Sequence, residues 1–160
     1  MTEYEKEIAA RVASHGWYGV GVIDPNGKDS PFIYSVGFPK TYGVPDCIVV
    51  GLPQQALINV ISAVHEQVSK GKDPVHGGLW DGLLPPPFQC RSIALPPQDA
   101  LGKYRMRSAE WYWHTVMQRT EPLQAFQIVW PCERTNRFPW DPECPKDVLE
   151  WQPLLGDPPA

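Results

Sequence analysis

The sequence lacks long apolar runs and an excess of positive charge. No stretch approaches the roughly 18 consecutive apolar residues of a membrane-spanning helix, and the N-terminal MTEYEKEIAARVASHG is charged and helix-like rather than a signal peptide. The net charge is −4, whereas nucleic-acid binding calls for a broad basic surface. We therefore expect a soluble, cytoplasmic protein that binds neither membranes nor nucleic acids.

Common enzyme and metal-site motifs are missing as well. There is no glycine-rich phosphate loop, no HExxH and no GxSxG. The four cysteines, Cys47, Cys90, Cys132 and Cys144, include no CxxC pair, and we predict no metal site. Two alternatives stay open: Cys132 and Cys144 pair with each other or bind a metal with a histidine, and the irregular loop around His76 holds a metal or acts as a lid.

Prolines and tryptophans, in contrast, are abundant. The chain has 19 prolines and 7 tryptophans in 160 residues, whereas proline usually makes up about 5% of a protein. The prolines are interleaved with aromatic residues, so they indicate fixed, sharp connections between short elements rather than disorder. A chain of this length fits one domain.

Hydrophobic periodicity predicts three helices and five strands. The helices are expected at about 3–14, 54–70 and 98–117, and the strands at 17–24, 31–38, 46–53, 88–95 and 123–130. The first two strands flank a turn-rich segment and form a hairpin. This order predicts a single α+β domain over residues 1–151, with a mainly antiparallel five-stranded sheet and two to three helices packed on it. The tail, 152–160, shows no pattern that predicts contacts with the rest of the domain, and it is expected to fray.

Five short phrases carry a resemblance to a known family. They are HGW (15–17), YSVGF (34–38), IVVGLP (48–53), VWP (129–131) and RFPW (137–140). In this order they resemble a bacterial family catalogued as domain of unknown function 4262, over about residues 15–141. Cys132 stands where such proteins often have aspartate, and Asn136 where they often have glycine. The resemblance implies one shared scaffold and brings no established activity, cofactor or catalytic residue.

Residues 127–144 hold two tryptophans, three prolines and two cysteines. This segment is interpreted either as a plug over the open end of the sheet or as the wall of a binding site. The second alternative is considered because tryptophan and tyrosine combine an apolar ring with one hydrogen-bonding group, which is favoured in pockets and interfaces. Arg134 and Arg137 are candidate anchors for an acidic partner. The candidate binding residues are Trp17, Tyr34, Ser35, Trp130, Arg137 and Trp140.

Two functions follow as hypotheses, with the catalytic residues and any cofactor unknown. The first is a non-catalytic protein that binds a protein partner, in the manner of a small immunity or regulatory factor, which the acidic charge and the aromatic surplus favour. The second is a small-molecule or flavin-type cofactor-binding protein or enzyme, with a pocket lined by Tyr34, Ser35, Trp130 and Trp140. The first predicts exposed apolar surface beyond that of an ordinary monomer.

Overall fold

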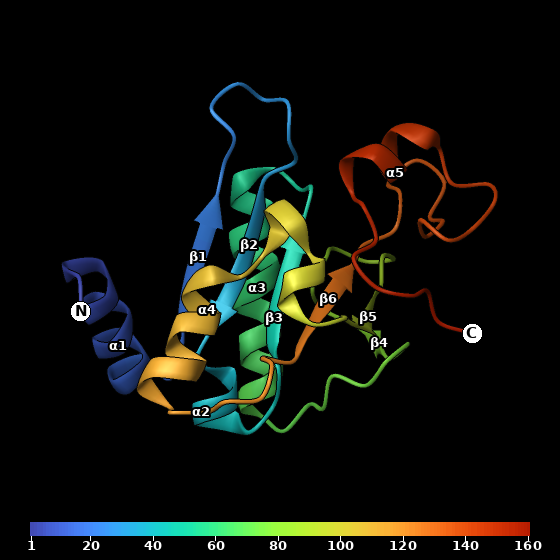
Figure 1. Ribbon diagram of the computed structural model, residues 1–160. Helices are drawn as coiled ribbons and strands as arrows, with labels where there is room; N and C mark the ends of the chain where they lie inside the picture. The colour runs from blue at the N-terminus through green and yellow to red at the C-terminus, as the bar shows by residue number, and fades with distance from the viewer.

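The computed structural model describes all 160 residues (Figure 1). The helices are α1 (Glu3–His15), α2 (Phe38–Tyr42), α3 (Gln54–Ser69), α4 (Arg107–Trp111) and α5 (Lys146–Trp151), with 3₁₀ turns η1 (Gln98–Ala100) and η2 (Gly102–Tyr104) and a π-helical turn η3 (Tyr112–Val116). The strands are β1 (Tyr18–Val22), β2 (Phe32–Val36), β3 (Asp46–Val50), β4 (Leu79–Trp80), β5 (Cys90–Ala94) and β6 (Ala125–Val129). None of the helices combines the length and the apolar character needed to cross a membrane.

The six strands form one mixed sheet in the order β1-β2-β3-β6-β5-β4. The expected α+β class is confirmed, and four of the five strand pairings are antiparallel. The expected numbers, five strands and two to three helices, are wrong, because the structure has six strands and five α-helices. The two halves of the sheet meet where β3 and β6 pair in parallel, with Cys47 opposite Phe126. Every residue of β2, β3 and β6 is buried, as expected for strands in the middle of a sheet that is covered on both faces. The strand that was not expected from the sequence, β4, is only two residues long.

Helices cover both faces of this sheet (Figure 1). On the far side, α3 packs its buried residues, among them Leu57, Ile61 and Val64, against the core. On the near side, α1 and the segment 98–117 cover a second cluster that includes Ile8 and Tyr112. The result is three layers with a core on each side of the sheet.

The first helix begins and ends as its sequence predicts. The Thr2 hydroxyl accepts from the Glu5 amide at 3.0 Å and the Glu5 carboxylate accepts from the Thr2 amide at 2.9 Å, which completes a capping box. Gly16 ends the helix at φ +89°, a conformation that glycine adopts without steric cost.

The third expected helix, 98–117, is broken into short turns. The Gln98 side chain accepts a hydrogen bond from the Met106 amide at 2.7 Å, and Met106 has φ −91° and ψ 69°, outside the helical region. A side chain that captures a backbone amide in this way competes with the helical hydrogen bond. An α-helix, α4, therefore begins only at Arg107.

The C-terminal tail, expected to fray, is instead held along β6. The Gln152 side chain accepts from the Trp130 amide at 2.9 Å and donates to the Trp130 carbonyl at 2.8 Å, as a paired strand would. The Gln127 side chain does the same for the tail, since it accepts from the Leu155 amide and donates to the Pro153 carbonyl. Two buried amide side chains thus extend the sheet's hydrogen bonding to the tail.

Candidate functional site

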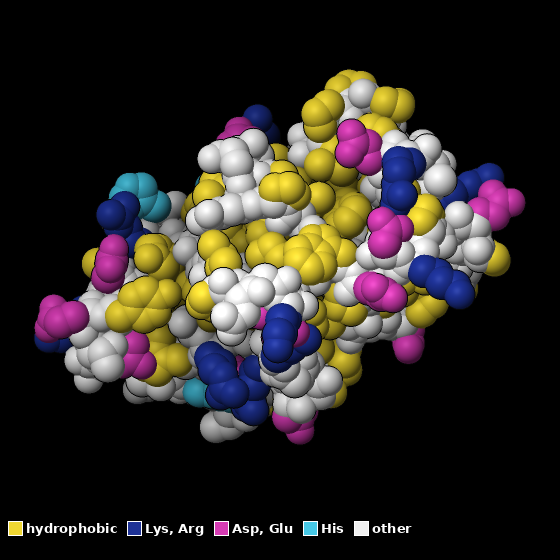
Figure 2. Space-filling view, turned by 90° about the horizontal axis from the view of Figure 1, so that it is seen from above, with side chains coloured by type: hydrophobic (Ala, Val, Ile, Leu, Met, Phe, Trp, Pro, Cys, Tyr) yellow, Lys and Arg dark blue, Asp and Glu magenta, His cyan; other side chains and the backbone are white.

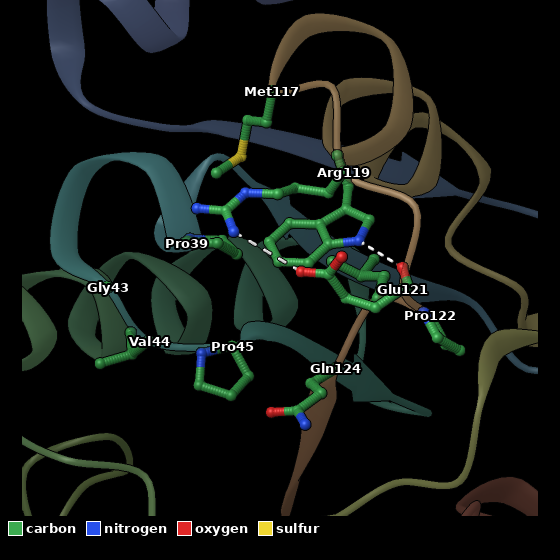
Figure 3. A pocket seen from close by; sticks show the side chains of 11 residues that line it. Pro39, Gly43, Val44, Pro45, Met117, Arg119, Glu121, Pro122 and Gln124 are labelled. Atoms are coloured by element: carbon green, nitrogen blue, oxygen red, sulfur yellow. Dashed lines mark hydrogen bonds and ion pairs between the residues drawn. The ribbon is translucent and has the colours of Figure 1, made fainter.

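A groove of about 340 Å³ opens beside α2, where the loop after η3 leads into β6 (Figure 3). We call it the Trp113 groove. It is lined by Pro39, Gly43, Val44, Pro45, Trp113, Met117, Arg119, Glu121, Pro122, Leu123 and Gln124. An adjoining hollow of about 370 Å³ shares Pro39, Met117 and Arg119 with the groove and adds Lys40 and Val116. The two form a continuous concave surface between α2 and the end of η3.

Trp113 and Arg119 form the centre of this groove. The Trp113 indole N–H donates to the Glu121 carbonyl oxygen at 2.7 Å, which fixes the ring. The Arg119 guanidinium lies 5.5 Å from the centre of that ring, within the range of a cation–π contact, and is 3.6 Å from the Glu121 carboxylate. Dashed lines in Figure 3 mark the indole hydrogen bond and this ion pair. Because these two charged side chains are each 54% exposed, their ion pair is weak and a ligand carboxylate can replace it.

The turn that carries Met117 and Arg119 has an unusual backbone. It follows the π-helical turn η3, and Gln118 has φ +56°. A left-handed conformation costs a residue with a side chain roughly 1–2 kcal/mol. The turn is held by hydrogen bonds from the Arg119 amide to the Trp113 carbonyl at 3.1 Å and from His114 Nδ1 to the Arg119 carbonyl at 2.8 Å. Rare backbone geometry of this kind clusters at functional sites, which supports a role for the groove.

A buried carboxylate fixes the opposite wall, residues 39–45. Asp46 begins β3 directly after this wall and is 2% exposed. Its carboxylate accepts from the Ser35 hydroxyl at 2.7 Å and from the Phe38 amide at 3.0 Å, and the Ser35 hydroxyl accepts from the Cys47 amide at 2.9 Å. The end of β2, the start of α2 and the start of β3 therefore converge on one side chain, which holds both ends of the wall.

Burial sets the acidity of this carboxyl group. It raises the pKa of Asp46 to about 7, although hydrogen bonds from the Ser35 hydroxyl and from the amides of Phe38 and Gly37 act in the opposite direction. The folded protein consequently keeps a proton on Asp46 at pH values where the unfolded chain has already released it.

Of the residues proposed from the sequence, Ser35 is the one that supports the groove. It is fully buried and donates to the carboxylate behind the wall. Its neighbour Tyr34 lies in the core cluster on the other side of the sheet from α3, where its hydroxyl oxygen accepts from the Ser108 amide at 3.0 Å. Trp17 stacks on His65 with ring centres 4.9 Å apart. Tyr34 and Trp17 therefore serve the packing of the helices on the sheet.

The two tryptophans of segment 127–144 are held away from the groove. Trp130 is 9% exposed, and its indole N–H donates to the Val50 carbonyl at 2.7 Å. Trp140 stacks on Phe138 with ring centres 4.9 Å apart and planes at 10°. These contacts favour the interpretation of the segment as a plug beside the sheet.

The two arginines of the same segment pair with nearby acidic residues. Arg137 contacts Asp141 at 3.2 Å and Glu143 at 3.0 Å. Arg134 makes two hydrogen bonds to Asp147, at 2.8 and 2.7 Å. Arg137 thus joins residues of its own loop, and Arg134 joins that loop to α5. Anchoring of an acidic partner by these arginines stays a prediction.

The loop around His76 is joined to the sheet rather than gathered around a metal site. His76 Nδ1 accepts from the Ala94 amide at 2.9 Å, and the Gly77 amide donates to the Ser92 carbonyl at 2.7 Å. No group of three or more His, Cys, Asp or Glu side chains is arranged to hold a metal ion.

A second concave surface lies at the opposite end of the sheet. A hollow of about 290 Å³ opens between β1 and α3, beside exposed Val22, Ile23 and Ile58. Figure 2 views the molecule from this end and shows hydrophobic side chains between charged ones. The lining of this hollow has no charged side chain, so it offers apolar contact without a group that would orient a ligand.

The Trp113 groove was not predicted from the sequence. Trp113 and Met117 fall at the end of an expected helix, 98–117, and look like ordinary helix residues, and Arg119 falls in the connection that follows it. The available signal was the prolines at 39, 45 and 122, which mark three rigid connections. Bringing these connections together requires the parallel pairing of β3 with β6, which periodicity does not reveal.

Among known proteins, the chain matches one family. No curated protein and no solved structure matches the chain. A family match covers residues 11–145, which includes α2, both walls of the Trp113 groove and the plug. The family is described as Domain of unknown function (DUF4262), and the chain belongs to it.

Proposed function

We propose that this protein is a non-catalytic binding protein that recognises an extended, acidic segment of a partner protein in the Trp113 groove. The lining of the groove is the observation that carries the proposal. The lining combines the apolar surfaces of an indole ring, a methionine and three prolines with one arginine. It contains no serine, threonine, cysteine or histidine. Its ionisable side chains, Arg119 and Glu121, pair with each other, which suits ligand binding better than catalysis.

The shape of the groove favours an extended chain. Rings of tryptophan and proline present flat apolar surfaces, on which an extended peptide packs with little loss of conformational entropy when it is itself stiff. The groove and its adjoining hollow measure about 340 and 370 Å³, near the lower end of the roughly 300–1,000 Å³ of ligand pockets. This space accommodates a few residues of a chain rather than a packed helix or domain.

The charges favour an acidic ligand. Arg119 lies at the centre, and Lys40 lines the adjoining hollow from α2. Glu121 already neutralises part of the arginine's charge, but this exposed pair is separated by 3.6 Å and gives little stability. A ligand carboxylate that forms two parallel hydrogen bonds to the guanidinium would be bound more firmly.

The second hypothesis, a flavin-type cofactor pocket, gains no support from these contacts. Tyr34, Ser35 and Trp130 are each 9% exposed or less. Each makes a hydrogen bond within the fold. Trp130 lines a hollow beside α5, with Val148 and Trp151, but Tyr34 and Ser35 are not part of its lining, so the expected residues do not form one pocket. We therefore propose the binding function alone.

Peptide arrays test the proposal. One array presents short peptides in which proline or leucine is flanked by glutamates, and the matched array replaces every glutamate by glutamine. The wild type should bind the glutamate array, and Arg119→Glu should lose this binding by at least about tenfold, because a charge-assisted hydrogen bond becomes a repulsion. Trp113→Ala should lose it as well.

The matched control is Trp111→Ala. Trp111 is also partly exposed but lines a different hollow, beside Thr2 and Tyr4. This variant should bind as the wild type does. Equal binding to both arrays, or unchanged binding by folded Arg119→Glu, would overturn the proposal.

A further inference from the structure

The hollow beside α5 measures about 410 Å³ and shares no residue with the Trp113 groove. It is lined by Trp130, Asp147, Val148, Glu150 and Trp151. We call it the α5 hollow. The helix stands beyond the end of β6 (Figure 1), whereas the Trp113 groove lies where β6 begins. The two surfaces are therefore at opposite ends of this strand.

Three side chains of α5 line the hollow from one side of the helix. Glu150 and Trp151 lie three and four positions after Asp147, and side chains at this spacing are neighbours on a helix surface. All three residues are exposed, whereas Val148 is 7% exposed and belongs to the hydrophobic cluster on the α3 side of the sheet. The helix therefore packs on the core through Val148 and presents two carboxylates beside a tryptophan ring.

Main-chain contacts bring the second tryptophan to the same place. Gln152, directly after Trp151, forms two hydrogen bonds with the backbone of Trp130, at 2.9 and 2.8 Å. The Trp130 indole N–H donates to the Val50 carbonyl at 2.7 Å, which fixes the ring. A methyl group at Gly51 would overlap the Trp151 carbonyl and contact the Trp130 ring, so the chain meets both tryptophans closely at this glycine. The fold thus positions the two tryptophans before any ligand binds.

The charge of the α5 hollow is negative. Asp147 and Glu150 line it, and the lining contains no lysine, arginine or histidine. Arg134, which is not part of the lining, pairs with Asp147 at 2.7 Å. Glu150 takes part in no ion pair. One carboxylate is therefore free to meet a positively charged ligand.

Other tryptophans receive a cation from the chain itself. The Lys72 ammonium lies 4.9 Å from the centre of the Trp80 ring, and the Arg119 guanidinium lies 5.5 Å from that of Trp113. Neither tryptophan of the α5 hollow has such a partner. The hollow thus combines aromatic rings with negative charge, two features that attract a cation, and has no cation of its own.

We propose that the α5 hollow binds an organic cation that carries a quaternary ammonium group. Its methyl groups contact the rings of Trp130 and Trp151, and the Glu150 carboxylate lies beside the positive charge. A primary ammonium suits this lining less well, because it is strongly hydrated and its N–H groups would face aromatic rings instead of acceptors. The volume, about 410 Å³, lies near the lower end of the roughly 300–1,000 Å³ of ligand pockets, which fits a small cation or a single side chain.

Titration of the full-length protein with choline tests the proposal. The indole signals are followed in a ¹⁵N-correlated NMR spectrum at constant chloride concentration. The Trp130 and Trp151 signals should shift in a saturable way, while the signal of buried Trp80 stays in place. The matched probe is the neutral analogue of choline in which carbon replaces nitrogen. It should bind at least about fivefold more weakly, because the cation–π attraction is lost.

A peptide with a trimethyllysine carries the same group on a protein side chain and is titrated separately. Saturable shifts of the two indole signals with either probe support the proposal. The tighter of the two probes shows whether the cation is a small molecule or a side chain of a partner protein.

Three variants complete the test. Glu150→Lys supplies an ammonium group inside the hollow and should lose choline affinity by at least about tenfold, because like charges then meet. Glu150→Gln should lose about threefold, as expected for an exposed charge pair, and Trp151→Leu at least about fivefold. An unchanged Trp80 signal shows that each variant is folded.

The matched control is Glu133→Gln. Glu133 is also exposed and in no ion pair but lies outside the hollow, so this variant should bind choline as the wild type does. Equal binding of choline and its neutral analogue, or unchanged choline binding by folded Glu150→Lys, would overturn the proposal.

Discussion

The buried carboxyl of Asp46 makes the stability of this protein depend on pH in an unusual direction. Most carboxyl groups release their protons more readily in a folded protein, but burial raises the pKa of Asp46 from 3.8 to about 7. Between these two values the folded state holds a proton that the unfolded state has lost. The free energy of unfolding should therefore fall as the pH rises through this interval, and Asp46→Asn should remove the fall.

The magnitude follows from the two pKa values. Their difference corresponds to roughly 4 kcal/mol, which is a large part of the stability of an ordinary domain. Asparagine keeps an oxygen that accepts from the Ser35 hydroxyl and the Phe38 amide, and it carries no charge. We expect the variant to gain about 4 kcal/mol relative to the wild type between pH 4 and pH 8.

Other groups also titrate, but comparing the two proteins removes their contribution. Salt bridging lowers the pKa values of Glu66 and Asp147, so these carboxylates lose their stabilising contribution as the pH falls below about 4.5. Burial lowers the pKa of His65, which adds stability as the pH rises toward about 6.5, and the gain is complete above that value. These effects are present in the wild type and in Asp46→Asn alike.

Urea unfolding at several pH values, followed by tryptophan fluorescence, measures the difference. The curves of stability against pH for the two proteins should diverge steadily between pH 4 and pH 7 and run parallel above it. Curves that stay parallel over the whole range would refute the reasoning, because Asp46 would then have the same pKa in the folded and unfolded states.

Three further substitutions are read by urea unfolding. Gln118→Gly should stabilise by about 0.5–1 kcal/mol, because glycine tolerates the left-handed backbone; a loss would contradict the assigned strain. Gly51→Ala should cost more than about 2 kcal/mol, because Gly51 has φ +94° and a methyl group would overlap the Trp151 carbonyl; near-neutrality would refute that contact. Gln152→Ala should cost about 2–4 kcal/mol and speed exchange of the Trp130 amide, which loses its partner; unchanged protection would show that the tail is not docked.

The elements predicted well from the sequence are those with local causes. The capping pair Thr2 and Glu5 and the cap at Gly16 define α1 without reference to the rest of the chain. The apolar stripe of α3 and the apolar runs of β3 and β6 likewise identify themselves by spacing. The family match, over residues 11–145, agrees with the short phrases that suggested it.

The remaining features depend on contacts between distant residues. A single side chain, Gln98, interrupts the expected third helix, and two others, Gln127 and Gln152, dock the tail. Neither effect has a periodic signature. The candidate site was missed for the same reason, since Trp113 meets the wall at 39–45 only after β3 and β6 have paired.

The indole signal of Trp113 in a ¹⁵N-correlated NMR spectrum reports directly on whether an acidic peptide binds in the Trp113 groove. Its N–H donates to the Glu121 carbonyl inside the groove, whereas that of Trp80 is fully buried in the core and serves as an internal reference. On titration with an acidic peptide selected from the array, the Trp113 signal should shift in a saturable way while the Trp80 signal stays in place. Saturable binding that leaves Trp113 in place, or that shifts the exposed Trp151 instead, would contradict it.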